Sequence, residues 1–97
     1  MKSSKYRACI NTGEDLDEKR FVVVDSEISL DQNEQCAQVF SSENEAFGAL
    51  EHIYHHAAEY MVTKFSQYII ERKLGVAWVP SSEYDSIIQT LEELESV

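Results

Sequence analysis

The sequence predicts an α+β fold, in which a small antiparallel β-sheet of about three strands carries two or three α-helices packed on one face. Two observations lead to this class. Segments between residues 6 and 40 alternate polar and apolar side chains, the pattern of strands, whereas from residue 42 onward apolar side chains recur every three or four positions, the pattern of helices. With 97 residues, 43% of them hydrophobic, the chain can form one acidic domain, residues 1–97, around a modest core.

The N-terminal part of the sequence contains the predicted strands. Tyr6 to Asn11 alternates with a period of two, which places Tyr6, Ala8 and Ile10 on one face. The acidic, glycine-containing stretch 11–18 is typical of a hairpin connection. Arg20 to Asp25 includes Phe21-Val22-Val23-Val24, which is apolar on both faces, as expected for a central strand.

Two further extended segments are predicted. Ser26 to Asp31 directs Ile28 and Leu30 inward and polar side chains outward. This segment either continues the preceding strand or follows a turn at Asp25–Ser26, and the sequence leaves both alternatives open. Gln35 to Phe40 is predicted to form one more strand.

A long helix is predicted after these strands. Ser42-Glu43-Asn44-Glu45 matches a capping box, in which the Ser hydroxyl and the Glu carboxylate each accept a hydrogen bond from a free backbone N–H. The helix would carry an apolar stripe formed by Phe47, Leu50, Tyr54, Ala57, Met61, Phe65 and Tyr68. Continued to Leu74, it would have about 33 residues and a length of roughly 50 Å. We therefore expect a kink or break within 61–64, where two β-branched residues adjoin.

The C-terminal part of the sequence predicts a second helix. Gly75 has the position of the glycine that ends a helix, and residues 76–79 form a short strand or an extended link. Pro80 and the two serines after it start the last helix. Its apolar stripe consists of Tyr84, Ile87 or Ile88, Leu91 and Leu94.

The formal net charge of −10 is the most informative property of the composition. It argues against direct binding of nucleic acid or anionic membranes, and it favours a cationic partner. Residues 21–63 and 74–97 contain no Lys or Arg, so the acidic residues are concentrated in two stretches. Either these stretches form a solvated face that keeps the protein soluble, or they bind a basic surface.

The acidic residues around the predicted sheet edge and helix start are our candidate contact surface. Alternate strand residues project to one face about 6.6 Å apart, so Asp25, Glu27 and Asp31 would form a row of carboxylates. Duplex DNA carries one negative charge per about 3.4 Å on each strand. Such a row can therefore occupy a Lys/Arg groove shaped for phosphates. The predicted partner-binding residues are Asp25, Glu27, Asp31, Glu34, Glu43 and Glu45.

The sequence gives little support for catalysis. It contains no phosphate-binding glycine loop, no nucleophile elbow and no metalloprotease motif, and we predict no catalytic residues, cofactor or metal. His52 and His56 share a helix face, as do Glu51, His55 and Glu59. A zinc site built on this cluster would need about four ligands, and exposed acid–His pairing is the plainer interpretation. Cys9 and Cys36 do not form a disulfide framework, and no signal peptide is evident, which favours the cytoplasm.

The length of the chain, its opening MKSSKYRACINTGEDLDEKRFVVVD and its base-free segments resemble the phage-borne type I-F anti-CRISPR proteins of the DNA-mimic kind. The resemblance implies an inhibitor that acts in the host bacterial cytoplasm. It implies binding to the basic surface of a CRISPR surveillance complex, on its large subunit and backbone subunits, which blocks target DNA. The sequence has no motif from which individual contact residues follow.

An alternative class is an acidic protein–protein interaction module, such as an antitoxin or a regulator, without DNA mimicry. Its contacts would centre on an apolar patch along Tyr84 to Leu94. A phosphate mimic should lose affinity steeply as salt rises, whereas an apolar interface should not.

Overall fold

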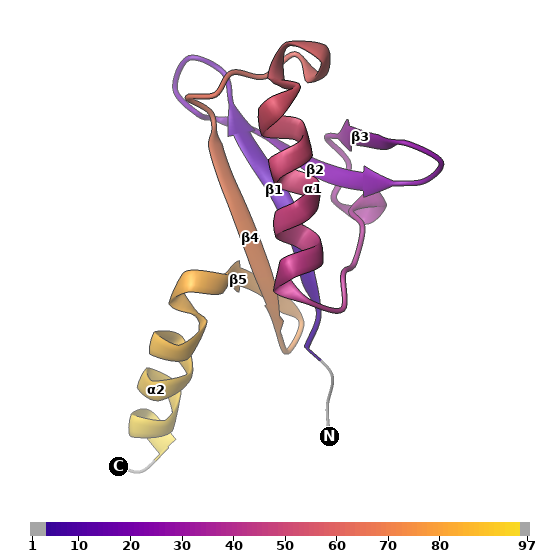
Figure 1. Ribbon diagram of the computed structural model, residues 1–97. Helices are drawn as coiled ribbons and strands as arrows, with labels where there is room; N and C mark the ends of the chain where they lie inside the picture. Colours follow the sequence, from indigo (N-terminus) through magenta and orange to yellow (C-terminus); the bar gives the residue numbers. More distant parts are fainter. Residues whose placement is uncertain (1–3, 96–97) are drawn as a thin grey trace.

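The computed structural model describes residues 4–95 and shows an α+β protein with one antiparallel five-stranded sheet and two α-helices (Figure 1). The spatial order of the strands is β3-β2-β1-β4-β5. Their bounds are β1 Tyr6–Thr12, β2 Glu18–Val24, β3 Ile28–Asp31, β4 Gln67–Leu74 and β5 Ala77–Pro80. The predicted class is confirmed. The predicted number of about three strands is too low, because β4 forms within the segment predicted to be helical.

Strand β1 is the centre of the sheet. It pairs with β2 through Cys9↔Phe21 to Thr12↔Glu18, and with β4 through Tyr6↔Arg72 to Asn11↔Gln67. All its residues except Asn11 are buried. The predicted face of Tyr6, Ala8 and Ile10 is confirmed, since all three belong to the core. The chain turns at residues 25–27, so β3 is a separate edge strand that pairs with β2.

The predicted long helix is wrong. Helix α1 spans Glu43–His55, a 3-10 turn, η2, spans Ala57–Tyr60, and the chain then becomes strand β4. Residue Met61 adopts a left-handed conformation, with φ of 57°, and reverses the chain direction. The apolar spacing of this region fits a helix, but Tyr68-Ile69-Ile70 also has high strand propensity. Pairing with β1 decides between them, because the hydrogen bonds and packing of a central strand outweigh local helix propensity.

Gly75 has a left-handed conformation, with φ of 64°, but the prediction that it ends a helix is wrong. Leu74 pairs with Ala77, so Gly75 and Val76 form the two-residue turn of the β4–β5 hairpin and do not end a helix. Positive φ at such a turn favours glycine. Of the two predictions for residues 76–79, the strand is confirmed.

The predicted strand Gln35–Phe40 is also wrong. Residues 34–36 form a 3-10 turn, η1 (Glu34–Cys36), with Asn33 as its N-cap. The remaining residues are extended but isolated, held by an N–H donated from Gln38 to the carbonyl of Val22 and by a bridge between Phe40 and Tyr6. The segment therefore contacts both β1 and β2 at single positions, beyond the point where these two strands pair with each other, and it forms no ladder of its own.

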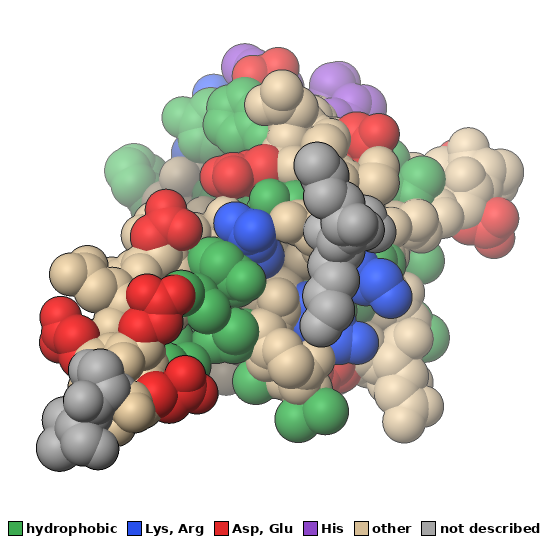
Figure 2. Space-filling model, turned by 90° about the horizontal axis from the view of Figure 1, so that it is seen from below, with side chains coloured by type: hydrophobic (Ala, Val, Ile, Leu, Met, Phe, Trp, Pro, Cys, Tyr) green, Lys and Arg blue, Asp and Glu red, His purple; other side chains and the backbone are tan. Residues whose placement is uncertain are grey.

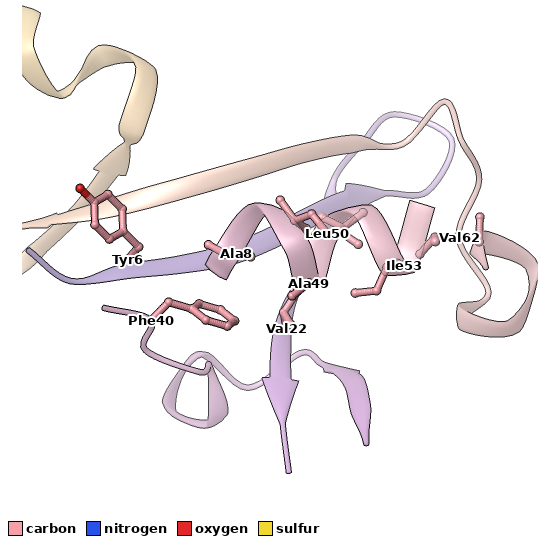
Figure 3. Packing of buried hydrophobic residues seen from close by; sticks show 11 residues of the cluster. Tyr6, Ala8, Val22, Phe40, Ala49, Leu50, Ile53 and Val62 are labelled. Atoms are coloured by element: carbon pink, nitrogen blue, oxygen red, sulfur yellow. The ribbon is translucent and has the colours of Figure 1, made fainter. Parts of the chain in front are cut away.

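Helix α1 packs across one face of the sheet and completes the core (Figure 3). The amide of Glu45 donates to the hydroxyl of Ser42, which confirms the predicted N-cap, while the Glu45 carboxylate accepts from Ser41. Its buried residues follow the spacing i, i+3, i+4, i+7 and are Ala46, Ala49, Leu50 and Ile53. The predicted stripe is confirmed only in part: Leu50 and Ala57 are buried in the core, whereas Phe47, Tyr54, Met61 and Phe65 are exposed.

Helix α2 (Tyr84–Glu95) follows a third 3-10 turn, η3 (Ser81–Glu83), and contains no buried residue. The second predicted helix therefore exists, but it does not pack on the sheet: it extends away as an arm (Figure 1). Its start is held by stacking, with the guanidinium carbon of Arg72 3.8 Å from the ring centroid of Tyr84. The arm accounts for a radius of gyration of 14.6 Å, against about 12.5 Å for a compact domain of this length.

Candidate functional site

Acidic side chains dominate the surface of the protein. All 18 Asp and Glu residues lie within residues 4–95, and every one except Glu71 is exposed. The pKa of Glu34 is lowered because its carboxylate accepts a hydrogen bond from Arg7 and lies beside the positive charge of that residue. The exposed carboxylates give the surface a strong negative field.

The three arginines, by contrast, are buried or half-buried. Arg7 is 5% exposed on the sheet face opposite α1, and its guanidinium carbon lies 4.7 Å from the ring centroids of both Phe21 and Trp78. It donates to Glu71 at 2.7 Å and to Glu34 at 2.8 Å. The ammonium group of Lys19 adds a second cation at 3.0 Å from Glu71. We call Arg7, Lys19, Phe21, Glu71 and Trp78 the arginine cluster.

The other two arginines are half-buried. Arg72 stacks between Tyr6 and Tyr84 and donates to the hydroxyl of Ser4. Arg20 lies 3.8 Å from the carboxylate of Glu18, and its Nε is buried without a hydrogen-bond partner. The fold therefore internalises its guanidinium groups and displays its carboxylates. Composition alone could not show this separation.

The six predicted contact residues lie in three places and do not form one continuous row. Asp25 and Glu27 lie in the β2–β3 turn and Asp31 ends β3, so these three share one exposed hairpin. The predicted row along one strand does not form, because two of its three members lie in the turn. Asp31 also accepts a hydrogen bond from the backbone N–H of Asn33 at 2.7 Å.

The remaining three predicted residues are separated from the hairpin. Glu34 lies in η1 and faces Arg7. Glu43 and Glu45 are both in the first turn of α1. Two helical positions differ by about 200° in direction, so these carboxylates project from opposite sides of the helix. We call Asp25, Glu27 and Asp31 the acidic hairpin, and we keep it as the most compact of the predicted groups.

The histidine cluster has a stacked geometry. The rings of His52 and His56 are parallel within 30° at a centroid distance of 4.5 Å, and the edge of Tyr60 lies against His52. Nδ1 of His56 is 2.9 Å from the carbonyl oxygen of His52. Among residues 4–95 no three His, Cys, Asp or Glu side chains converge as metal ligands would.

The two cysteines are free and differ in environment. Cys36 is exposed on η1, whereas Cys9 is buried on β1 beside the arginine cluster. Burial, with a smaller contribution from the charge of Glu71, raises the pKa of the Cys9 thiol to about 12. The thiolate form is therefore scarce at neutral pH, and Cys9 behaves as a small core residue.

A groove between α1 and the sheet is a feature that the sequence prediction missed. It has a volume of about 810 Å³ and lies between α1, β4 and η3. Phe47 and Tyr54 form its α1 side, Tyr68 and Ile70 form its floor on β4, and Glu83 lies at its η3 end. Burial raises the pKa of Tyr68, whose hydroxyl donates to the carbonyl of Thr63. The sequence contains one signal for the groove: α1 carries more aromatic residues than a single core face needs. The predicted apolar stripe places Phe47 and Tyr54 in the core, whereas they line the groove.

The described part of the chain holds no helix with both the length and the apolar character needed to cross a bilayer. Comparison of the chain with protein-family models, with curated proteins and with solved structures gave no match. The function must therefore be inferred from the geometry of the protein itself.

Proposed function

We propose that this protein is a non-enzymatic inhibitor whose exposed carboxylates occupy the basic, nucleic-acid-binding surface of a partner protein. One observation carries the proposal: every acidic side chain except Glu71 is exposed, while all three arginines are buried or half-buried. The resulting surface has the charge of a nucleic-acid backbone and needs no chemistry. Occupancy releases counterions from both surfaces and forms charge-assisted hydrogen bonds with the Lys and Arg of the partner.

The resemblance to the type I-F anti-CRISPR proteins gives the proposal its specific form. The partner is then a type I-F CRISPR surveillance complex in the host bacterial cytoplasm. Its large subunit and backbone subunits bind this protein in place of target DNA. No cofactor, metal or membrane is involved, and the acidic hairpin is the first contact surface that we propose.

The acidic hairpin also has a plainer interpretation, because β3 is an edge strand. Charged side chains on an edge strand prevent other chains from pairing with it. Residues Asp25, Glu27 and Asp31 could serve this purpose without binding any partner. The two interpretations differ in which change does harm. Reversal of the three charges to Lys keeps the edge charged, so it should abolish inhibition only if the carboxylates bind a partner, whereas neutral Asn and Gln at the same positions should cause aggregation if the charges protect the edge.

The test is a competition experiment with purified surveillance complex and fluorescent target DNA. We expect the protein to displace the DNA, and the variant D25K/E27K/D31K to lose this activity by at least about tenfold, since three charge-assisted contacts are reversed. The matched control D85K/E92K/E95K reverses three exposed carboxylates on α2 and should retain most of the inhibition. Retained inhibition by the hairpin variant would show that the contact surface lies elsewhere, and no displacement by the wild-type protein would reject the partner.

A second candidate function is supported by the exposure of α2. Leu91 and Leu94 are 45% and 68% exposed on α2, which contains no buried residue, as an apolar interaction surface would require. In Figure 2 carboxylates lie along the arm, and hydrophobic side chains lie between the arm and the body of the protein. Binding measured at 50 and 300 mM salt separates the two functions. Carboxylate mimicry predicts a steep loss of affinity at the higher salt concentration, and an apolar interface predicts little change.

A further inference from the structure

The groove exists because one helix is too narrow to cover the sheet. An α-helix with its side chains is about 10 Å wide, whereas the outer strands of a five-stranded sheet are about 19 Å apart at 4.8 Å per strand. Helix α1 packs mainly on β1. The part of the same face over β4, beside the β5–η3 connection, is left without a helix, and this is where the groove lies.

The walls of the groove are apolar and partly open to solvent. Phe47 is 55% exposed and Tyr54 is 40% exposed, although both lie beside the core. On the floor, Tyr68 and Ile70 pack against the core and are only partly buried. Large side chains that form a continuous concave surface are characteristic of helix-binding grooves. The dimensions and the apolar lining fit one more amphipathic helix.

The charge of the rim restricts what that helix can be. Glu43, Glu51 and Glu83 line the groove, and none of its lining residues is Lys or Arg. Lys64 lies at the end where α1 finishes, with its ammonium group 5.5 Å from the ring centroid of Tyr54, and the guanidinium group of Arg72 on β4 is held against Tyr6 and Tyr84. A helix with an apolar stripe between basic residues would pair with the rim, whereas an acidic helix would be repelled.

The two occupants that this chain itself could supply are disfavoured by charge. Helix α2 has an apolar stripe, but it carries Asp85, Glu92 and Glu95, and residues 74–97 contain no base. Folding α2 back over the groove, or docking the α2 of a second copy there, would bring these carboxylates toward Glu43 and Glu51. Like charges placed together at an interface are unfavourable.

We propose that the groove between α1 and β4 binds an amphipathic helix of a partner protein, with its apolar stripe in the groove and Lys or Arg residues on both sides of the stripe. The inference does not rest on the acidic hairpin, because the hairpin takes no part in lining the groove. It therefore gives the protein a second, partly apolar interaction surface beside its carboxylates.

The test is a titration of the ¹⁵N-labelled full chain with a synthetic helical peptide, followed by amide chemical shifts. The probe is a 14-residue peptide of Leu and Lys with all the Leu on one helix face, and a scrambled peptide of the same composition is its control. We expect the amphipathic probe to bind at least about tenfold more tightly than the scrambled one, a difference of about 1.4 kcal/mol. The largest shifts should fall on α1 and β4. Equal binding of the two peptides, or shifts centred on the acidic hairpin, would mean that only net charge is recognised.

Two variants test the groove directly. Phe47→Glu introduces a charge on its α1 wall, and Glu51→Lys reverses a charge on its rim; both positions are exposed, so the fold should survive. Each should weaken probe binding by about tenfold. The control Val76→Glu, at a fully exposed turn outside the groove, should have no effect. Unchanged affinity of the first two variants would overturn the proposal.

The other occupants give distinct results without any peptide. Groove shifts that grow with protein concentration would indicate a second copy of the chain, and nuclear Overhauser contacts between Leu91 and Tyr54 would indicate that α2 folds back. Either result would overturn the proposal. Neither would affect the competition experiment with target DNA, so failure of the groove and failure of the proposed function are distinguishable.

Discussion

The two faces of the sheet are covered by different kinds of interaction. On one face, Ala8, Ile10 and Val22 of the sheet form one apolar cluster with residues of α1 such as Ile53, and the stabilisation comes from buried apolar surface. Figure 3 shows Val22 beside Ala49 of α1. On the other face no α-helix of residues 4–95 is buried against the strands, and the arginine cluster forms the layer instead. Arg7 is as deeply buried there as most core residues, but its burial depends on Glu71 and on two aromatic rings.

The comparison shows how a small acidic protein can keep its carboxylates outside. A second helix on the open face would require more chain, whereas side chains from four strands and η1 cover it at the cost of one buried acid. The cations used for this purpose no longer neutralise the outer surface. The arginine cluster therefore leaves the exposed carboxylates with more net negative charge for binding a partner.

The largest expected effect tests the charged face. Glu71→Gln preserves the shape of the side chain but removes the charge that lies 2.7 Å from Arg7 and 3.0 Å from Lys19. Breaking a buried ion pair from one side costs about 3–5 kcal/mol, and we expect a loss of about 3 kcal/mol in urea unfolding. The control Glu51→Gln, at an exposed position, should change stability by less than about 0.5 kcal/mol. If both variants unfold at the same urea concentration, the cluster does not stabilise this face.

The apolar face is tested by a smaller truncation. Ile53→Val removes one methylene group from a side chain with no exposed surface and should cost about 1 kcal/mol. The matched change in α2, Ile88→Val, removes the same group from a half-buried position and should cost less than half as much. Urea unfolding of both variants gives the comparison, and equal losses would contradict the view that α2 lies outside the core.

The smallest expected effect links the charged face to pH. Hydrogen bonding and charge from Arg7 lower the pKa of Glu34 below its ordinary value of 4.5. A carboxyl with a lowered pKa in the folded state stabilises the protein above its ordinary pKa, and this contribution disappears as the pH falls through the lowered value. Glu34→Gln should therefore reduce stability slightly at pH 7 and not at pH 2.5. The difference in unfolding midpoint between wild type and variant, measured from pH 7 to pH 2.5, reports this directly.

Local patterns predicted those parts of the fold that are decided by neighbouring residues. Period-two alternation located β1, the Ser42 hydroxyl located the start of α1, and the short apolar run at 76–79 indicated the strand that is β5. The net charge and the two base-free stretches are likewise properties of the sequence alone. These predictions hold because each depends on one turn, one cap or one strand.

The other features of the fold depend on contacts between residues far apart in the sequence, so only the tertiary structure decided them. Residues 67–74 have both helical spacing and strand propensity, and pairing with β1 makes them a strand. The same pairing ends α1 at His55, exposes Phe47 and Tyr54, and leaves the groove beside them. It also places Glu71 opposite Arg7, residues 64 positions apart, so that the arginine is buried and the other carboxylates face solvent. The physical reason is that partners far apart in sequence compete with local preferences, and the hydrogen bonds and burial of a central strand are the stronger term.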